Sequence, residues 1–338
     1  MSLPECIAIT GLGTFLGGAL VERFSEIADG PRLIALDRRI PRRLLGRVDL
    51  HPIDLTAIDA EVQLAQVLER EAVDVVVHLA FRQFPRADLD ADYRLEALGS
   101  QRIALACSDS AVGVRRLVVA STTMLYGPHA DNPNFLAEEH PLRGHPHAHC
   151  VQNRVAVEEM LASWSAENPQ VELTILRHCW VMGPSIDDAV VRHFERSVVP
   201  TPMGFDPLLQ FIHENDLVDV FEAATLESHP GIFNVVGDGV VPVSVLLARA
   251  QKRRLSLPGP LLETVGQTPS QRDSGDRAEG FYDYFRYLWI ADGERAWSRF
   301  GAPHYSTEEA WTAFVTSRQE RLGEAQGPDI GFGGHSDG

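Results

Sequence analysis

Five short apolar runs, each separated from the next by a helical pattern, constrain the fold of this 338-residue chain more than any other feature. The runs are CIAIT (6–10), RLIALD (32–37), VDVVVHLA (73–80), RRLVVAST (115–122) and VELTILR (171–177). Apolar residues recur with a 3.6-residue period over 15–27, 58–70, 88–110 and 150–166. Buried strands that alternate with amphipathic helices are typical of βαβ units. The sequence therefore predicts an α/β fold, a Rossmann-type doubly wound parallel sheet.

The pattern becomes less regular after residue 178. Strand-and-helix units recur at 209–227 and 231–252, followed by aromatic-rich helical segments. We therefore expect a dinucleotide-binding domain over 1–178 and a smaller C-terminal substrate lobe over 179–322, with some strands and helices of this lobe returning to the first domain. Residues 323–338 are rich in glycine and poor in apolar residues, which predicts a flexible tail.

The charge balance argues against nucleic-acid and membrane partners. Acidic residues outnumber basic ones 47 to 30, which gives a net charge of −17 at pH 7. Phosphate backbones and anionic membrane surfaces repel such a chain. The four cysteines form no C-x-x-C pair, and no uncharged apolar stretch reaches the roughly 18 residues that span a bilayer. We therefore expect a cytoplasmic protein.

The first apolar run leads into TGLGTFLG, residues 10–17, which opens a helix. Glycines at such a junction let a pyrophosphate approach the backbone at the positive end of the helix. Asp37 ends the second run and suits the hydroxyls of a ribose. The arrangement predicts dinucleotide binding with NAD favoured over NADP. The adjacent Arg38 and Arg39 leave NADP possible, because one of them can turn to a 2′-phosphate instead of remaining solvated.

The chain resembles the extended short-chain dehydrogenase/reductase family, the NAD-dependent epimerases and dehydratases that act mostly on nucleotide sugars. The matching stretches are TGLGTFLG (10–17), IDL (53–55), VVVHLAF (75–81), ASTTMLYG (120–127), LRHCWVMGP (176–184), QFIHENDLVDVFEAA (210–224) and GIFNVVG (231–237). The resemblance implies the fold of that family, a nicotinamide cofactor, and a homodimer formed through the helices expected at 88–110 and 150–166.

The same resemblance implies where NAD would lie. The implied cofactor-binding residues are Gly11, Gly13, Thr14, Phe15, Leu16, Gly17, Asp37, Arg38, Asp54, Leu55, Leu79, Ala80, Phe81 and Arg154. The family has glycine where this chain has Thr14, and Gly13 stands one place early, so we expect a reshaped phosphate loop. No set of metal ligands is expected.

The family's catalytic residues are only partly retained. Thr122 falls on the catalytic Ser/Thr position. With Glu158 fixing the register, Cys150 and Arg154 take the places of the tyrosine that removes a substrate proton and the lysine that holds the nicotinamide ribose. Lys252, the only lysine of the chain, is expected far from the nicotinamide. The chain is thus identified as an atypical member that lacks the Tyr-x-x-x-Lys dyad.

Several interpretations of this replacement remain open. In the first, Cys150 is a silent buried thiol and Arg154 only contacts the ribose. In the second, Cys150 is the acid/base, with a pKa lowered by Arg154. In the third, His147 or His149 supplies the proton. A fourth groups four histidines around a metal ion, namely His140, His145, His147 and His149.

The substrate side also departs from the family. Trp180 replaces an asparagine and Leu209 an arginine, and both family residues commonly help to hold a nucleotide diphosphate. Their loss favours a more apolar ligand beside Trp180. His213 and Asp216 match positions that we interpret as structural. Two classes of function follow. One is an oxidoreductase or epimerase with a substituted acid/base, acting on a sugar-like or small hydroxyl or carbonyl substrate; the other is a catalytically silent NAD(P)-binding sensor.

Overall fold

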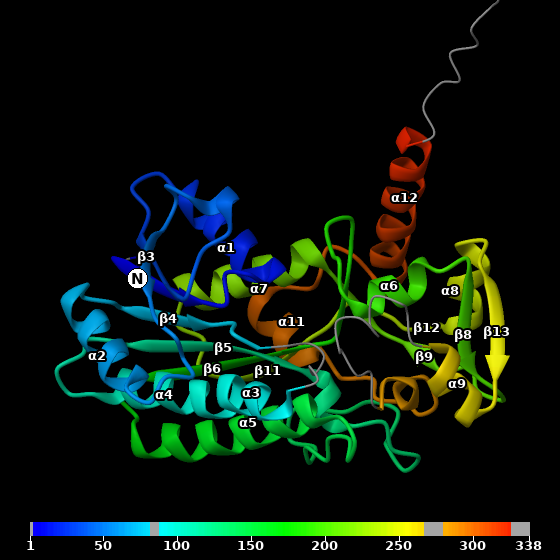
Figure 1. Cartoon of the computed structure of the whole chain (residues 1–338), viewed down its shortest axis with the longest axis horizontal. Coiled ribbons are helices and arrows are strands. Elements are labelled where there is room, and N and C mark those ends of the chain that lie inside the picture. Colours follow the sequence, from blue (N-terminus) through cyan, green and yellow to red (C-terminus); the bar gives the residue numbers. More distant parts are fainter. Residues whose placement is uncertain (1–2, 82–87, 267–279, 326–338) are drawn as a thin grey trace, which may run out of the picture.

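The computed structural model describes residues 3–81, 88–266 and 280–325. Its centre is a seven-stranded parallel sheet with the strand order β11-β6-β5-β4-β1-β2-β3 (Figure 1). The strands are β1 (Cys6–Thr10), β2 (Arg32–Asp37), β3 (Asp49–Pro52), β4 (Val75–His78), β5 (Arg116–Thr122), β6 (Glu172–His178) and β11 (Gly231–Val235). The order reverses next to β1, as in doubly wound folds, and the predicted α/β fold class is confirmed.

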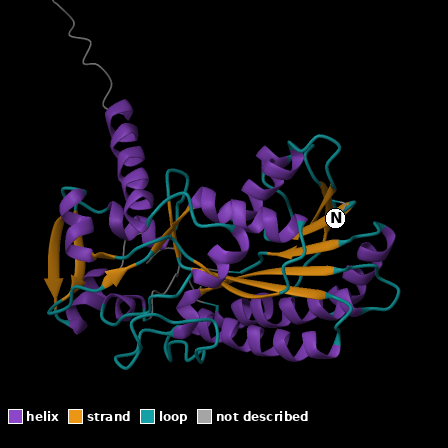
Figure 2. Ribbon diagram, turned by 180° about the vertical axis from the view of Figure 1, so that it is seen from behind, coloured by secondary structure: helices purple, strands orange, loops and turns teal. Residues whose placement is uncertain are grey.

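Helices cover both faces of this sheet (Figure 2). One face carries α1 (Phe15–Ser25) and α7 (Glu214–Leu226), and the other carries α2 (Ala60–Arg70), α4 (Gly99–Ser108) and α5 (His149–Glu167). Successive strand residues point to opposite faces, so Ile7 and Ile9 join one apolar core while Ala8 joins the other. Alternate residues of the same strands thus contribute to the apolar cores on the two faces of the sheet.

The sequence located some elements better than others. The first two apolar runs coincide with β1 and β2, and the other three overlap β4, β5 and β6. It missed β3, a four-residue edge strand without a buried residue and therefore without an apolar signal. The helix expected over 88–110 is interrupted, because a π-helical turn (η2, Arg94–Leu98) separates α3 (Leu89–Tyr93) from α4. Such turns often lie near functional sites.

The second part of the chain adds small sheets, short helices and an aromatic core. Its remaining strands are β7 (Trp180–Met182), β8 (Val198–Pro202), β9 (Leu208–Leu209), β10 (Phe211–His213), β12 (Val241–Pro242) and β13 (Arg253–Leu257). Its helices are α6 (Ala189–Glu195), α8 (Val243–Arg249), α9 (Gly259–Gly266), α11 (Glu294–Phe300) and α12 (Thr307–Ala325). Across the described residues of both parts there are also three 3-10 turns, namely η1 (Arg42–Leu44), η3 (Thr123–Tyr126) and η4 (Phe281–Phe285).

Two elements after residue 178 pack on the first part of the chain. β11 pairs with β6 in the central sheet, and α7 packs against α1 and β5. The division at residue 178 itself remains a prediction. α12 projects from the rest of the chain and continues to Ala325, past the expected start of the tail at 323. Residues 326–338 lie outside the described residues. Within the described ranges, no helix combines the length and the apolarity needed to cross a bilayer.

Candidate functional site

A cavity of about 300 Å³ opens where β1, β4, β5 and β6 end. Its lining is drawn from both parts of the chain: Gly13, Thr14, Phe15, Leu16, Leu79, Phe81, Ala120, Thr122, Met124, Arg154, His178, Trp180, Val181, Ile186, Asp187, Asp188 and Leu217. The crevice at the carboxyl ends of the strands is where open α/β sheets bind their ligands. Eight predicted site residues meet in this one cavity: Gly13, Thr14, Phe15, Leu16, Leu79, Phe81, Thr122 and Arg154.

The glycine loop forms one wall of the cavity, and close packing fixes two of its glycines. Gly11 has φ +75°, and an added Cβ would lie 2.5 Å from the carbonyl carbon and oxygen of Leu79. At Gly17 an added Cβ would lie 2.6 Å from the carbonyl oxygen of Gly11. Gly13 differs, because a Cβ there would meet nothing within 4 Å. Two glycines thus bring strand, loop and helix together, and the third leaves the wall open.

Thr14, the residue that departs from the family motif, is the N-cap of α1. Its hydroxyl accepts a hydrogen bond from the backbone N–H of Gly17 at 3.0 Å and donates one to the carbonyl of Gly11 at 2.8 Å. A threonine at this position stabilises the start of the helix. The Thr14 hydroxyl is the acceptor for one backbone N–H at the positive end of α1, that of Gly17. The other N–H groups of the first turn have no acceptor within the helix.

The predicted ribose-binding residues lie beside the glycine loop and outside the cavity lining. The Asp37 carboxylate accepts hydrogen bonds from the N–H of Leu12 at 3.1 Å and from that of Arg38 at 2.8 Å. The exposed Arg38 lies 3.6 Å from a carboxylate oxygen of Asp54, and the hydrogen bond from Thr56 lowers the pKa of Asp54. Asp37 therefore braces the loop, and Arg38 points toward a carboxylate.

Leu55 and Ala80 complete the predicted cofactor residues and also lie outside the cavity lining. Leu55 is buried, and its carbonyl accepts a hydrogen bond from Arg102 at 2.5 Å. Ala80 packs partly buried against the same apolar core as Leu55. Both side chains serve packing in this structure, and any contact with a cofactor remains a prediction.

Three polar side chains, from β5, α5 and β6, form another part of the cavity wall: Thr122, Arg154 and His178. Thr122 and His178 are register partners at the ends of β5 and β6. The Thr122 hydroxyl accepts a hydrogen bond from the N–H of Met124 at 3.2 Å, and the Arg154 guanidinium lies over the ring of Phe81 at 5.1 Å. His178 was missed from the sequence. The available signal was that it ends its strand just as Thr122 ends the neighbouring one.

Cys150 is not part of this wall. It is 4 % exposed and does not line the cavity. Burial, reinforced by the carboxylate of Glu96, raises the pKa of the thiol to about 12 against the opposing effect of Arg154. The structure thus favours a protonated thiol, and a catalytic role for Cys150 has no geometric support.

His140, His145 and His147, which precede α5, and His149, its first residue, also lie outside the cavity lining. His147 and His149 are exposed, whereas His145 is buried with its Nε2 2.9 Å from a carboxylate oxygen of Asp283. The Nδ1 of His140 accepts a hydrogen bond from the N–H of Ala137 at 2.9 Å. Neither the proton-donor nor the metal interpretation of this loop gains support from these positions.

Glu158, which set the register of α5, faces the sheet together with Cys150 and Arg154. These positions are four residues apart and so share one buried face of the helix. The Glu158 carboxylate forms an ion pair with Arg177 at 2.6 Å. Arg154 therefore faces the sheet one turn before this ion pair, close to where the strands end.

Of the two substrate-side residues that depart from the family, Trp180 lines the cavity and Leu209 lies in the apolar core. Trp180 lines the cavity and packs its buried ring against Phe285 and Trp289, with centroid distances of 5.3 and 4.9 Å. Leu209 is fully buried in the apolar core and does not reach the cavity. Lys252 donates from Nζ to the backbone carbonyls of Glu195 and Arg196, remote from the cavity lining. No lysine therefore replaces the missing one.

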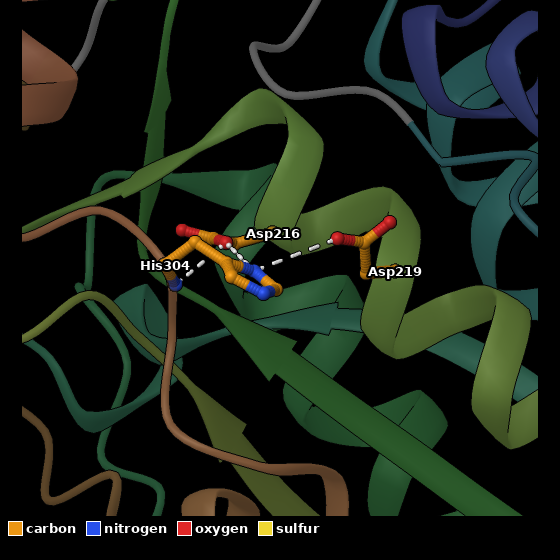
Figure 3. A group of neighbouring side chains, drawn as sticks. All are labelled: Asp216, Asp219 and His304. Carbon is orange, nitrogen blue, oxygen red and sulfur yellow. Dashed lines mark hydrogen bonds and ion pairs between the residues drawn. The ribbon is translucent and has the colours of Figure 1, made fainter.

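Asp216, Asp219 and His304 form a second group of ionisable side chains (Figure 3). The Asp216 carboxylate accepts hydrogen bonds from the backbone N–H groups of His304 and Tyr305 at 2.9 and 3.1 Å. Asp219 pairs with Arg23 on α1 at 2.9 Å. These contacts hold α7 to the segment before α12 and to α1, as the structural interpretation of Asp216 implies.

His213 has a similar role at the start of α7. Its Nδ1 accepts a hydrogen bond from the N–H of Asn215 at 3.2 Å, and its ring stacks on Tyr305 with 3.9 Å between centroids. Both contacts belong to the scaffold, because neither residue lines the cavity. His213 and Asp216 thus tie the same end of α7 to the chain before α12.

The family model described as "NAD dependent epimerase/dehydratase family" matches residues 7–236 of this chain. The chain belongs to this family. The matched residues include the glycine loop (10–17) and all the residues that line the cavity. Uncharacterized proteins of Mycobacterium bovis and Mycobacterium tuberculosis are 28 % identical to it over 325 residues, which cover 93 % of this chain and 84 % of theirs.

Solved structures show the same fold at low identity. MoeE5 in complex with UDP-glucuronic acid and NAD is 21 % identical, with a TM-score of 0.70 over 94 % of this chain and 100 % of that one. The UDP-glucose 4-epimerase of Thermotoga maritima, solved with UDP-glucose, is 18 % identical, with a TM-score of 0.71 over 94 % and 99 %. A short-chain dehydrogenase/reductase superfamily protein of Agrobacterium tumefaciens with bound NAD gives 19 % and 0.71 over 95 % and 99 %.

Proposed function

We propose that this chain binds NAD(H) along the glycine loop and exchanges hydride with a hydroxyl or carbonyl carbon of a small or sugar-like substrate. It is then an oxidoreductase or epimerase in which another group replaces the catalytic tyrosine. The observation that carries this proposal is the cavity itself, because it joins the glycine loop to Thr122 and Arg154. Family membership and the NAD-bound relatives of the same fold support it.

The residues present fit a dinucleotide. Gly13 leaves open space on the loop, and the start of α1 offers amide groups to a pyrophosphate. Leu79 and Phe81 give the cavity an apolar side suited to a flat ring. When bound, a nicotinamide supplies the carbon that accepts or returns the hydride.

Two side chains have defined tasks in this proposal. Arg154 donates hydrogen bonds to the hydroxyls of the nicotinamide ribose, a task for which a guanidinium has five N–H donors. The Thr122 hydroxyl orients the reacting oxygen of the substrate. Trp180 contributes a buried apolar ring to the cavity lining, beside the space left for the substrate.

The charges in the cavity favour a substrate without a diphosphate. Arg154 is the one Lys or Arg side chain among the described residues that line it, and Asp187 and Asp188 contribute carboxylates. Beside Asp187 and Asp188, the diphosphate of a nucleotide sugar would meet repulsion without a positively charged clamp, whereas the pyrophosphate of NAD has the amide groups at the start of α1. We therefore propose a neutral hydroxyl or carbonyl compound and not a nucleotide sugar.

Calorimetric titration with NADH tests the binding step, and absorbance at 340 nm tests turnover. We expect saturable binding at one site per chain. The turnover panel combines NAD⁺ with free sugars, polyols and hydroxy acids, and combines NADH with their carbonyl counterparts. Absence of NADH binding would contradict the proposal.

A coupled assay with UDP-galactose and NAD⁺ tests the expected lack of UDP-galactose 4-epimerase activity. Loss of a positioned acid/base typically lowers a rate about 10²- to 10⁴-fold, and the missing diphosphate clamp adds to this loss. We expect no appreciable turnover. Turnover near about one per second, as in ordinary enzymes, would show that Cys150, Arg154, Trp180 and Leu209 had been misinterpreted.

The second candidate is a catalytically silent NAD(H)-binding sensor that acts through a partner or as a homodimer. Cys150 favours it, because the residue in the tyrosine position is buried and remains protonated. NADH binding without turnover across the whole panel would support the sensor, whereas turnover with any member of the panel would exclude it.

A further inference from the structure

His178 occupies the end of β6, at the junction between the central sheet and the cavity. Its register partner on the neighbouring parallel strand is Thr122. Adjacent strands lie about 4.8 Å apart, and register partners project to the same face of the sheet. The imidazole therefore stands beside the Thr122 hydroxyl, and both line the cavity.

The hydrogen bonds of His178 determine which nitrogen carries the proton. Nδ1 lies 2.8 Å from the backbone carbonyl oxygen of Cys179. A carbonyl only accepts, so Nδ1 is the N–H donor, and Nε2 of the neutral ring keeps its lone pair. No described residue donates a hydrogen bond to Nε2. The ring thus has an unused acceptor in a cavity-lining residue.

The surroundings of His178 keep the ring neutral. Burial lowers the pKa of His178 to about 4, partly offset by the bond to Cys179, and the charge of Arg154 on α5 lowers it further. The other titratable groups near it are the cavity carboxylates Asp187 and Asp188 and the thiol of Cys179, whose pKa burial raises to about 12. The unprotonated ring is therefore present throughout the neutral range.

We propose that Nε2 of His178 accepts the proton of the substrate hydroxyl, the task that falls to tyrosine in relatives with the dyad. This inference rests on the proposed function. In the oxidising direction the O–H bond breaks and its proton moves to Nε2. The oxygen electron pair forms the C=O bond, and the hydride passes from carbon to the oxidised nicotinamide. When the hydride returns to the same carbon in the reverse step, the imidazolium formed by the oxidation gives the proton back to the oxygen.

The proposal distinguishes His178 from its rivals by position. Cys150, His147 and His149 do not line the cavity, whereas His178 does. It also explains how the site functions without the dyad, because Thr122 and His178 place a hydroxyl and an unprotonated nitrogen side by side. An acceptor at this point selects a ligand that presents a hydroxyl group.

Carbethoxylation with diethyl pyrocarbonate, read by peptide mass spectrometry, tests the state and place of Nε2 without any substrate. The reagent attacks an unprotonated ring nitrogen. We expect His178 to react at pH 7 and to keep more than half of its rate at pH 5.5. A free histidine derivative in the same tube loses most of its rate, since its pKa is about 6.5. Saturating NADH should slow labelling of His178 at least about tenfold, and the exposed His304 serves as the unprotected control.

The outcomes separate the two proposals. If calorimetry shows NADH binding but labelling of His178 is unchanged, the His178 assignment is overturned and the proposed function stands. If NADH does not bind, the proposed function fails first. If His178 loses its reactivity at pH 5.5 as the free histidine derivative does, the neutral-acceptor assignment is overturned.

The variant His178→Gln tests whether the proton acceptor is needed for turnover. The amide still accepts a hydrogen bond but takes no proton. We expect NADH affinity within about threefold of wild type and a loss of turnover of at least about 100-fold with any substrate the panel reveals. His51→Gln, on β3, is the matched control and should leave turnover unchanged. Turnover of His178→Gln within about threefold of wild type would overturn the proposal.

Discussion

Arg177 and His178 are neighbours on β6, but the alternation of the strand sends them into two different buried regions. Arg177 faces α5, where its guanidinium donates to Glu158 at 2.6 Å, to the Tyr126 hydroxyl at 2.9 Å and to the Glu138 carbonyl at 3.0 Å. We call these four residues the Arg177 network. His178 faces the cavity, and only its Nδ1 is engaged by the protein.

The difference between the two regions lies in how fully their polar atoms are used. In the Arg177 network, the Tyr126 hydroxyl donates a hydrogen bond to the side-chain oxygen of Asn234, and the Ser121 hydroxyl donates one to Glu158. The guanidinium, the hydroxyl and the carboxylate at its centre therefore all have protein partners. A saturated buried network of this kind fixes one packing arrangement. The cavity wall keeps an acceptor available to a ligand. Of these two neighbours on β6, Arg177 is fully paired within the scaffold, and His178 keeps an unused acceptor at the candidate site.

The substitution Glu158→Gln breaks the saturated region and should have the largest effect. It leaves Arg177 buried without its counter-charge, which typically costs about 3–5 kcal/mol of the free energy of unfolding. Urea denaturation followed by circular dichroism measures this loss. Arg249→Gln, which removes an ion pair exposed at the surface, is the control and should cost less than about 1 kcal/mol. A loss below about 1 kcal/mol for Glu158→Gln would remove the distinction between the two regions.

The substitution Arg154→Ala tests the cavity wall. A hydrogen bond to a charged group is worth about 1.5–3 kcal/mol, so NADH affinity should fall roughly ten- to a hundredfold. Cys150→Ala should keep the affinity within a few-fold, because the thiol lies outside the cavity lining. Calorimetry on both variants measures the contrast. Unchanged affinity in Arg154→Ala would show that the register set by Glu158 is wrong.

His193 shows that a buried polar group outside the cavity can also lack a hydrogen-bond partner within the described part of the chain. Its ring is surrounded by aromatic rings, among them Phe194 and Phe281 at 5.3 Å, and its Nε2 has no hydrogen-bond partner among the described residues. Burial lowers the pKa of His193 to about 3. The unfolded chain, with a pKa of about 6.5, binds this proton more readily, so stability present above pH 6.5 is lost as the pH falls.

The substitution His193→Phe removes this titration. The loss in the free energy of unfolding between pH 7 and pH 5 should shrink by about 2 kcal/mol, since one such group contributes at most about 1.4 kcal/mol per pH unit below 6.5. Urea denaturation at both pH values provides the comparison. An equal loss in both proteins would show that His193 is protonated in the folded state.

The preference between NADH and NADPH tests Asp37 and Arg38, which lie beside the glycine loop and outside the cavity lining, and it should give the smallest effect. We expect NADH to bind about tenfold more tightly than NADPH, or about 1.4 kcal/mol, because the Asp37 carboxylate repels a 2′-phosphate. Calorimetric titration with both cofactors measures the ratio. Tighter binding of NADPH would show that Arg38 or Arg39 sets the preference instead of Asp37.

The amino-acid sequence alone determined the elements that depend on local pattern. The bounds of β1 and β2 follow from uninterrupted apolar runs, and the glycine loop follows from a motif contained in eight residues. The face of α5 that carries Arg154 and Glu158 follows from helical spacing. Each of these features is fixed by residues a few positions apart, which is the range that periodicity reports.

Only the tertiary structure decided which of these elements meet and which groups remain available. β3 carries no apolar signal, and β11 joins the sheet by pairing with a strand about sixty positions earlier. Burial keeps Cys150 protonated, although the sequence shows only a thiol one helical turn from an arginine. His178 enters the candidate site because parallel register sets it beside Thr122. Which strands become neighbours, and which polar groups their contacts bury, depend on residues far apart in the sequence, and the periodicity of a short segment does not report them.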